Sequence, residues 1–344
     1  MSSSPLPAGR LLDGVLTGVL DAAETAVPAH ALGAPASVGA PASVGGSADV
    51  AGVAALLARR VRADAGRPLL TFYDDATGER TELSATTIDN WVAKTANLLV
   101  DTLGVTAGET VRIALPPHWQ TAVVLLAAWS VGAQVGVHQP GAATGAGTAA
   151  GEGVAAGTDS HDDPPVAVFV TEQAVDDPAV VGDGAEIIAL SLRPLGGRLA
   201  QPVPGVLDFA AEVLSHGDRF TPPAPPANQR FLARLAGYYA RTWELAATDR
   251  VLTTAGYDTP DGLFGGLLAP LAAGASVVLC RHLDPGLLAR RIAVERVTAI
   301  CAPTRYDPPR PVASEPADPT RPPRPDTPAE RATPTVRHLT TGLP

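Results

Sequence analysis

Few side chains in this sequence are arranged for chemistry, and lysine is the scarcest of them. Of the 25 basic residues in the 344-residue chain, only Lys94 is a lysine. A mechanism that needs a lysine on a phosphate, on an adenylate or in a Schiff base must therefore use Lys94 or is excluded. His216 and Asp218 could form a catalytic base and its partner, but the run His-Gly-Asp-Arg is more typical of a solvated turn. The sequence predicts no catalytic residue in this turn.

Metal and nucleophile patterns do not occur in the sequence either. The seven histidines have no i, i+4 or clustered spacing. Ser130 lies in AWSVG, which lacks the first glycine of G-x-S-x-G and falls at the end of a predicted helix. Cys280 and Cys301 each close a run of β-branched residues, which predicts two buried thiols in neighbouring strands. We expect no metal ligand and no cofactor-binding residue. Three acidic pairs fall in predicted turns, where aspartate binds local backbone: Asp74 and Asp75, Asp162 and Asp163, and Asp176 and Asp177.

Charge and hydropathy limit the partners of the chain. The formal net charge is -10 and the arginines are scattered, which argues against nucleic acid, because phosphates attract clustered bases. Asp13 breaks the N-terminal apolar stretch and no basic lead precedes it, so we expect no secretory signal. Gln134 and several prolines interrupt the apolar runs before they are long enough to span a membrane. We therefore expect a cytoplasmic protein that binds neither nucleic acid nor a membrane.

Three segments lack the composition of a folded core. Residues 1–48 contain the repeat GAPASV, residues 141–165 are rich in glycine and alanine, and residues 307–344 are rich in proline. Such segments bury too little apolar surface to offset the entropy lost on ordering. We expect all three to be disordered. Residues 216–227 are also rich in proline, and we interpret them as a linker between two folded parts.

Between these segments apolar strands alternate with helices. In residues 49–215 a hairpin about ATGER precedes a helix that Ser84 can cap, and further apolar runs predict strands. In residues 228–306 the runs VLTT, SVVLC and VTAIC alternate with helical patterns, one of them capped by Asp284. Strands without polar alternation are typical of parallel sheets covered on both faces. The sequence therefore predicts an α/β fold with two doubly wound, largely parallel lobes, 49–215 and 228–306.

Two stretches of the sequence resemble the AMP-binding, or adenylate-forming, family, which includes the acyl-CoA synthetases. Residues 83–137 resemble the family's order of helix, G-V-x-x-G-D-x-V strand, proline turn, helix and G-A-x-x-V strand. Residues 247–306 resemble its D-R-V, G-L-L-x-P-L-x-x-G-A-x-V-V-L and E-R-V-T blocks. The resemblance covers residues 66–306 and implies the N-terminal domain of enzymes that activate a carboxylate with ATP and Mg²⁺. It is carried mostly by structural positions.

The chain departs from the family where the family holds ATP. Family members place the phosphates on a Ser/Thr/Gly-rich loop that ends in lysine, before the helix that here begins near Asn228. Residues 216–230 instead have the sequence HGDRFTPPAPPANQR, which contains no lysine and four prolines without an N–H donor. Asp258 and Thr259 stand where the family has an aromatic–His pair. We expect the mobile C-terminal domain of the family to be absent as well, so the resemblance implies a short form and transfers no functional residue.

These observations together predict a non-catalytic AMP-binding-like protein, a pseudoenzyme without a cofactor, that binds a small ligand or a protein partner. The alternative is an enzyme, or an enzyme subunit, of acyl or coenzyme A metabolism that another chain completes and that uses ATP or AMP with Mg²⁺. A structural adaptor is the third possibility. The resemblance places a pocket rim at Tyr257, Asp258, Thr259 and Thr304. We expect apolar residues of positions 257–264 to face water and to support self-association.

Overall fold

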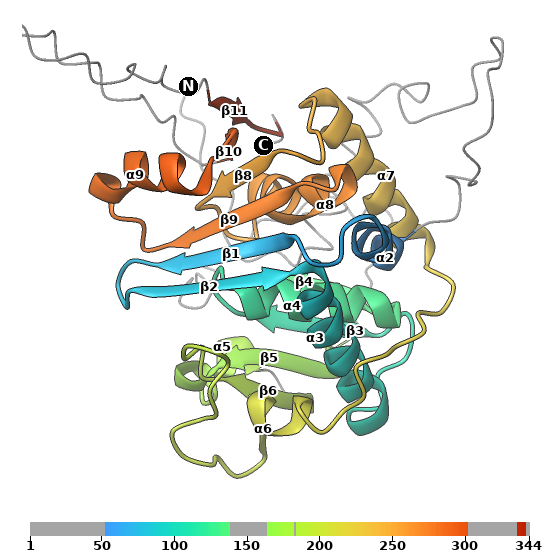
Figure 1. The fold of residues 1–344 in the computed structure, drawn as a ribbon. Coiled ribbons are helices and arrows are strands. Elements are labelled where there is room, and N and C mark those ends of the chain that lie inside the picture. The colour runs from blue at the N-terminus through green and yellow to red at the C-terminus, as the bar shows by residue number, and fades with distance from the viewer. Residues whose placement is uncertain (1–51, 138–163, 182–183, 302–335, 342–344) are drawn as a thin grey trace, which may run out of the picture.

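The computed structural model describes residues 52–137, 164–181, 184–301 and 336–341 (Figure 1). In this part of the chain the strands form a five-stranded and a six-stranded sheet, and helices pack against both. The predicted α/β fold with largely parallel sheets is confirmed. The segment 1–48 and most of the segments 141–165 and 307–344, all predicted to be disordered, lie outside the described residues.

The five-stranded sheet is parallel throughout. In its centre Ile113 lies opposite Val137 on one side and opposite Phe169 on the other. The strand that contains Phe169 is buried at every position, as the lack of polar alternation predicts. The order across the sheet is β4 (Gln134–Val137), β3 (Thr110–Ala114), β5 (Ala167–Thr171), β6 (Glu186–Leu190) and β7 (Val206–Asp208).

The six-stranded sheet joins segments from both ends of the described chain. β1 and β2 form an antiparallel hairpin, and every other pair of neighbours is parallel. Phe72 of β1 lies opposite Leu279 of β9, so the hairpin extends a sheet built from the second half of the chain. The predicted lobes, 49–215 and 228–306, do not follow the sheets at this hairpin. The order is β11 (Arg337–Leu339), β10 (Ala299–Cys301), β8 (Arg250–Thr253), β9 (Ser276–Arg281), β1 (Pro68–Asp74) and β2 (Glu79–Ser84).

The two cysteines lie in this sheet. Cys280 of β9 and Cys301 of β10 are buried free thiols, as predicted. Their strands are not neighbours, because β8 lies between them. Burial raises the pKa of Cys280 to about 11 and that of Cys301 to about 12, which keeps both thiols protonated and unreactive at neutral pH.

β11 comes from the segment that was predicted to be a disordered tail. Arg337 in this strand donates from Nη1 to the carbonyl oxygens of Trp243, at 2.8 Å, and Glu244, at 3.0 Å. Its Nη2 lies 2.7 Å from a carboxylate oxygen of Asp249. The prediction of disorder therefore does not hold for residues 336–341, where a short strand finds partners that the local composition does not reveal.

The helix α4 forms the centre of the core. All 13 of its residues are buried, as is typical of a helix that is hydrophobic on every side. Figure 1 shows it between the β1–β2 hairpin and β3, and it packs against strands of both sheets. His118 caps its N-terminus, and Gly132 ends it in the left-handed conformation with φ 90°. The packing of one helix against both sheets explains why apolar side chains from each sheet meet in one large core, beside smaller clusters.

The remaining helices connect the strands and pack against the sheets, against α4 or against one another. Ser84 caps α3, as predicted: its Oγ accepts from the Thr87 N–H at 3.1 Å. Asp284 caps α9 in the same way, through the N–H of Gly286 at 2.8 Å. The helical segments are α2 (Val53–Ala63), α3 (Ala85–Asn97), η2 (Leu98–Thr102), α4 (Trp119–Val131), η3 (Glu172–Ala174), α5 (Pro178–Val181), α6 (Phe209–Val213), α7 (Ala227–Thr242), η4 (Asp261–Leu268), α8 (Ala269–Ala273) and α9 (Pro285–Glu295).

The segment η4 is π-helical and lies directly against the six-stranded sheet. A Cβ added at Gly262 would lie 1.9 Å from the carbonyl oxygen of Gly256. A Cβ added at Gly265 would lie 2.2 Å from Sγ of Cys301. Only glycine allows so close an approach, so these residues fix the position of the connection that follows β8.

Candidate functional site

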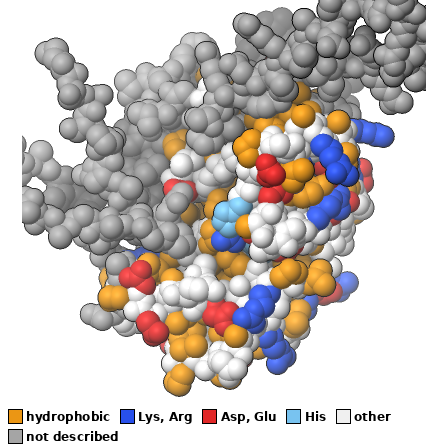
Figure 2. All heavy atoms as spheres, turned by 90° about the vertical axis from the view of Figure 1, so that its left-hand side faces the viewer, with side chains coloured by type: hydrophobic (Ala, Val, Ile, Leu, Met, Phe, Trp, Pro, Cys, Tyr) orange, Lys and Arg blue, Asp and Glu red, His pale blue; other side chains and the backbone are white. Residues whose placement is uncertain are grey.

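Ligands of open α/β sheets bind outside the carboxyl ends of the strands. In the six-stranded sheet this edge carries Asp74 at the end of β1, Arg281 at the end of β9, and the residues that follow Thr253 of β8. In Figure 1 the arrowheads of β1 and β9 point to this edge, and Figure 2 views the molecule from that side. Figure 2 shows a histidine and an arginine side chain among apolar groups there. The candidate site therefore begins at this edge and extends inward between the sheets.

Asp74 is the centre of the first group of polar residues. One of its carboxylate oxygens lies 2.8 Å from Nδ1 of His282, and the other lies 3.8 Å from a guanidinium nitrogen of Arg281. The first oxygen also accepts from the backbone N–H of Ala76 at 3.0 Å. Asp74 is buried, whereas half of the His282 side chain, 51%, is exposed. The group therefore presents an imidazole to solvent with a carboxylate behind it, an arrangement that can bind a small polar ligand.

His118 and Glu79 form the second group, deeper between the two sheets. Nδ1 of His118 accepts from the Gln120 N–H at 3.2 Å, so the neutral imidazole carries its proton on Nε2. That Nε2 lies 4.0 Å from a carboxylate oxygen of Glu79. Burial lowers the pKa of His118, and Glu79 offsets this effect only in part. Burial also acts to raise the pKa of Glu79, but His118 and the Thr81 hydroxyl outweigh it and the pKa is lowered.

Three consecutive residues at the start of α4 leave buried polar atoms unpaired. Nε2 of His118, Nε1 of Trp119 and Oε1 of Gln120 find no hydrogen-bond partner within the described part of the chain. All three residues are at most 2% exposed. Such atoms could bind a small polar group.

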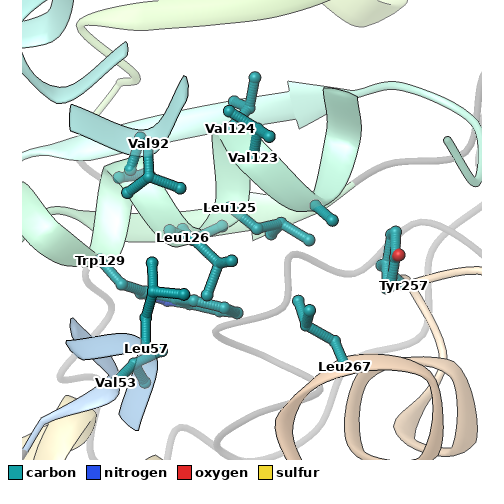
Figure 3. Close-up of a cluster of buried hydrophobic side chains, with 14 of the residues drawn as sticks. Val53, Leu57, Val92, Val123, Val124, Leu125, Leu126, Trp129, Tyr257 and Leu267 are labelled. Atoms are coloured by element: carbon teal, nitrogen blue, oxygen red, sulfur yellow. The ribbon is translucent and has the colours of Figure 1, made fainter. Parts of the chain in front are cut away.

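Tyr257, the first residue of the predicted pocket rim, is packed into the core. Tyr257 is 2% exposed, and Figure 3 shows it with Leu267, facing Leu125 and Leu126 of α4. Burial raises the pKa of Tyr257, and its hydroxyl has no hydrogen-bond partner among the described residues. A phenol in this setting stays protonated and acts as a core residue with one polar atom.

The other rim residues have different places. Thr259 is exposed and caps the first turn of η4, since its Oγ1 accepts from the Gly262 N–H at 3.1 Å and donates to the Gly256 carbonyl at 2.8 Å. Asp258 is half-buried beside it. Thr304 lies outside the described residues. The structure thus brings Tyr257, Asp258 and Thr259 together in one connection after β8.

The expectation that apolar residues of positions 257–264 face water was wrong. Leu263 and Phe264 are 1% and 0% exposed, because η4 packs against the sheet. A segment from near the end of the chain also covers this region. Asp261 Oδ1 accepts from the Thr341 N–H at 2.6 Å and from its hydroxyl at 2.7 Å, and Trp243 Nε1 donates to the Thr340 carbonyl at 3.2 Å. Self-association through an exposed apolar rim at this place has no structural basis.

Residues 216–226 precede α7, where the family resemblance places the phosphate loop. Side chains of α3 hold this segment by hydrogen bonds to its backbone carbonyl groups. The chain's lysine, Lys94, donates from Nζ to the carbonyl oxygen of His216. Asn97 donates from Nδ2 to the carbonyl oxygens of Gly217, at 2.8 Å, and Arg219, at 3.0 Å. The cation and the amide that could meet a phosphate are thus occupied by the segment's own backbone.

The same segment lies at the amino edge of the five-stranded sheet. A Cβ on Gly132 would lie 3.8 Å from Pro223, and Gly132 ends α4 just before β4 begins. Pro225 lies against Gly52 at the start of α2. In Figure 1 the segment passes α3 on the side away from the arrowheads of β1 and β9. It is therefore remote from the carboxyl edge that carries Asp74.

A charged cluster on another face of the sheet fastens α9 to the β1–β2 hairpin. Arg291 binds Asp75 with two hydrogen bonds, at 2.6 and 3.0 Å, and lies 4.1 Å above the ring of Tyr73. The hydrogen bonds from Arg291 hold the pKa of Asp75 below its ordinary value. Glu295 receives hydrogen bonds from Tyr73 and Arg80. Because these groups occupy one another, the cluster is structural.

The sequence did not single out Asp74, Glu79, Arg281 or His282 as site residues. Asp74 and Arg281 end β1 and β9, and His282 follows β9, so their position at a strand end was the signal available. Glu79 begins β2 and had no such signal. His118 had a stronger signal, since it follows two prolines and precedes an apolar helix.

Within the described ranges, no three His, Cys, Asp or Glu side chains are grouped as metal ligands. In the same part of the chain no helix is long and apolar enough to cross a membrane.

Comparisons with known proteins agree with this fold. The sequence matches no family model. It is 42% identical over 258 residues to a "TIGR03089 family protein" from Mycobacterium tuberculosis (strain H37Rv), which covers 72% of this chain and 96% of that protein. At this identity and coverage, the chain belongs to the TIGR03089 family.

Two solved structures share the fold at low sequence identity. A Brucella canis acyl-CoA synthetase matches with a TM-score of 0.58 and 17% identity, over 74% of this chain and 48% of that one. An anthranilate CoA ligase in complex with anthranoyl-AMP matches with a TM-score of 0.53 and 14% identity, over 73% and 49%. The predicted resemblance to adenylate-forming enzymes is confirmed for the fold. The chain spans about half the length of these two proteins.

Proposed function

We propose that this member of the TIGR03089 family is a non-catalytic, adenylate-forming-like protein that binds a small ligand or a protein partner in the cytoplasm and uses no cofactor. The observation that carries the proposal is the segment 216–226, which precedes α7. Its carbonyl groups are held by Lys94 and Asn97, and it lies at the amino edge of the five-stranded sheet.

Phosphoryl and adenylyl chemistry needs backbone N–H groups and a cation that converge on the phosphates. Positions 222, 223, 225 and 226 of this segment are proline and have no N–H to donate. Loss of one preorganised donor typically lowers a rate by roughly 10²–10³-fold. Loss of several donors together with the cation therefore supports the absence of adenylate formation.

The carboxyl edge of the six-stranded sheet is the place where we propose that a ligand binds. His282 is half exposed and is backed by the carboxylate of Asp74, with Arg281 beside it. The connection that contains Tyr257, Asp258 and Thr259 leaves the same edge. A small polar molecule that both accepts and donates hydrogen bonds fits these groups. His282→Ala should weaken its binding and leave the fold intact, because this side chain is half exposed.

Exchange of labelled pyrophosphate into ATP tests the catalytic half of the proposal. We expect no acid-dependent exchange above a heat-treated control with a panel of aliphatic and aromatic carboxylic acids. ATP with Mg²⁺ should also leave the melting temperature unchanged, because a ligand stabilises a protein only in proportion to its occupancy. Robust exchange that depends on the added acid would refute the proposal.

The half-length match to the two solved synthetases favours one other candidate function. In that case the chain is a subunit for carboxylate activation with ATP or AMP and Mg²⁺, and a second chain supplies the missing groups. Purification of the tagged protein with its natural partners, followed by the same exchange assay, separates the two candidates. Exchange by the complex but not by the chain alone would support the subunit and contradict a binding protein.

A further inference from the structure

The helices α2 and α7 carry positive charge only. They lie side by side at one corner of the molecule (Figure 1). Neither helix contains an aspartate or a glutamate. Their basic residues are Arg59, Arg60 and Arg62 in α2 and Arg230, Arg234 and Arg241 in α7.

Five arginines of these two adjacent helices have no acidic partner, and we call the group the arginine face: Arg59, Arg62, Arg230, Arg234 and Arg241. None of them lies within 4.0 Å of a carboxylate among the described residues. All except Arg230, which is half-buried, are exposed. Elsewhere in the described structure Arg80, Arg250, Arg281 and Arg337 of the six-stranded sheet and Arg291 of α9 do have such partners. Positive charge left unpaired on a chain with a net charge of -10 attracts acidic groups.

One aromatic ring, that of Phe231, helps to hold an arginine of this face in position. The guanidinium of Arg234 lies 5.8 Å from the ring centre of Phe231, within range of a cation–π contact. Arg241 lies about two turns further along the helix, and its guanidinium is 3.4 Å from a Cβ added at Gly237. Because both side chains project from one rigid helix of 16 residues, the face is preorganised to meet an extended acidic segment.

The segment of this chain that adjoins the face is acidic. Residues 1–51 join α2 at Gly52, where an added Cβ would lie 2.5 Å from Pro225, beside the start of α7. In the sequence this segment contains four acidic residues and one arginine: Asp13, Asp21, Glu24, Asp49 and Arg10. The roughly 28 residues from Glu24 to Gly52 can span far more than the about 24 Å length of α7.

We propose that Asp13, Asp21 and Glu24 dock onto the arginine face of the same chain. Attachment through Gly52 makes the encounter intramolecular, which raises the effective concentration of the segment. Each exposed ion pair is weak and is screened by salt. The docking is therefore reversible and sensitive to ionic strength.

Disulfide trapping in the full-length chain tests this proposal. Thr17→Cys places a thiol between Asp13 and Asp21, and Gly237→Cys places its partner within the arginine face. The native thiols, Cys280 and Cys301, are buried and do not compete. The matched control pairs Thr17→Cys with Ala76→Cys, at the exposed turn of the β1–β2 hairpin. At low salt we expect an intramolecular disulfide to form at least about fivefold faster with position 237 than with position 76.

Charge reversal provides the second arm of the test. Arg234→Glu with Arg241→Glu should remove the advantage of the 17–237 pair, and Asp21→Arg with Glu24→Arg in that background should restore it. Salt at about 0.5 M should also remove it. Equal rates for positions 237 and 76 would overturn the proposal, as would indifference to charge reversal. Disulfides that form only between two molecules would assign the face to a second copy and would also contradict it.

Discussion

The buried histidine at the start of α4 makes folding stability depend on pH, and His118→Asn should remove that dependence. His118 is 1% exposed, and its Nδ1 accepts the N–H of Gln120 as a helix N-cap. Asparagine is among the best N-cap residues, and its Oδ1 can accept the same hydrogen bond. The substitution therefore keeps the cap and removes the group that titrates.

The sign of the effect follows from the lowered pKa of His118, whose main cause is burial. In the unfolded chain this histidine takes up a proton as the pH falls through about 6.5. The folded chain takes it up only at a lower pH, so acid favours the unfolded state. The free energy of unfolding then falls with decreasing pH by up to about 1.4 kcal/mol per pH unit, and this loss begins below about pH 6.5. Above that pH the contribution is fully present.

Urea unfolding, followed by tryptophan fluorescence at steps from about pH 7.5 to about pH 5, measures this slope. The difference in unfolding free energy between the wild type and His118→Asn should change steadily below about pH 6.5, in favour of the variant. Ser84→Asn is the matched control, because it changes the N-cap of α3 without removing a titrating group. Parallel curves would refute the reasoning. A growing advantage of the wild type in acid would show that Glu79, at 4.0 Å, stabilises the imidazolium instead.

Two further predictions concern packing and buried charge. Gly262→Ala should destabilise the fold by more than about 2 kcal/mol in thermal unfolding, because the added Cβ would lie 1.9 Å from the Gly256 carbonyl oxygen. Gly66→Ala is the control. A Cβ added at Gly66 has no atom within 4 Å, so this variant should change stability by less than about 0.5 kcal/mol. Arg291→Met should lower the free energy of unfolding in urea by about 3 kcal/mol or more, because the buried carboxylate of Asp75 loses the two hydrogen bonds that Arg291 donates. Addition of Asp75→Asn should recover much of that loss, and no recovery would contradict this reasoning.

Local sequence determined the elements of this protein and their class. The apolar helix between His118 and Gly132, the caps at Ser84 and Asp284, and the strands without polar alternation each follow from patterns within a few residues. Such patterns act through backbone hydrogen bonds and side-chain periodicity, which are short in range. The fold class could therefore be predicted from the sequence, and so could the proline-rich segment before α7, with its missing N–H donors.

Tertiary structure alone decided which strands share a sheet. Nothing in the local pattern of the β1–β2 hairpin shows that Phe72 lies opposite Leu279, or that Arg337 joins β10 after a proline-rich stretch. The candidate site depends on the same long-range pairing, since Asp74 meets His282 only because β1 and β9 are neighbours. His118 meets Glu79 only because α4 packs beneath the hairpin. These contacts depend on the shapes and free edges of elements far apart in the sequence, whereas a sequence pattern reports only on the element that contains it.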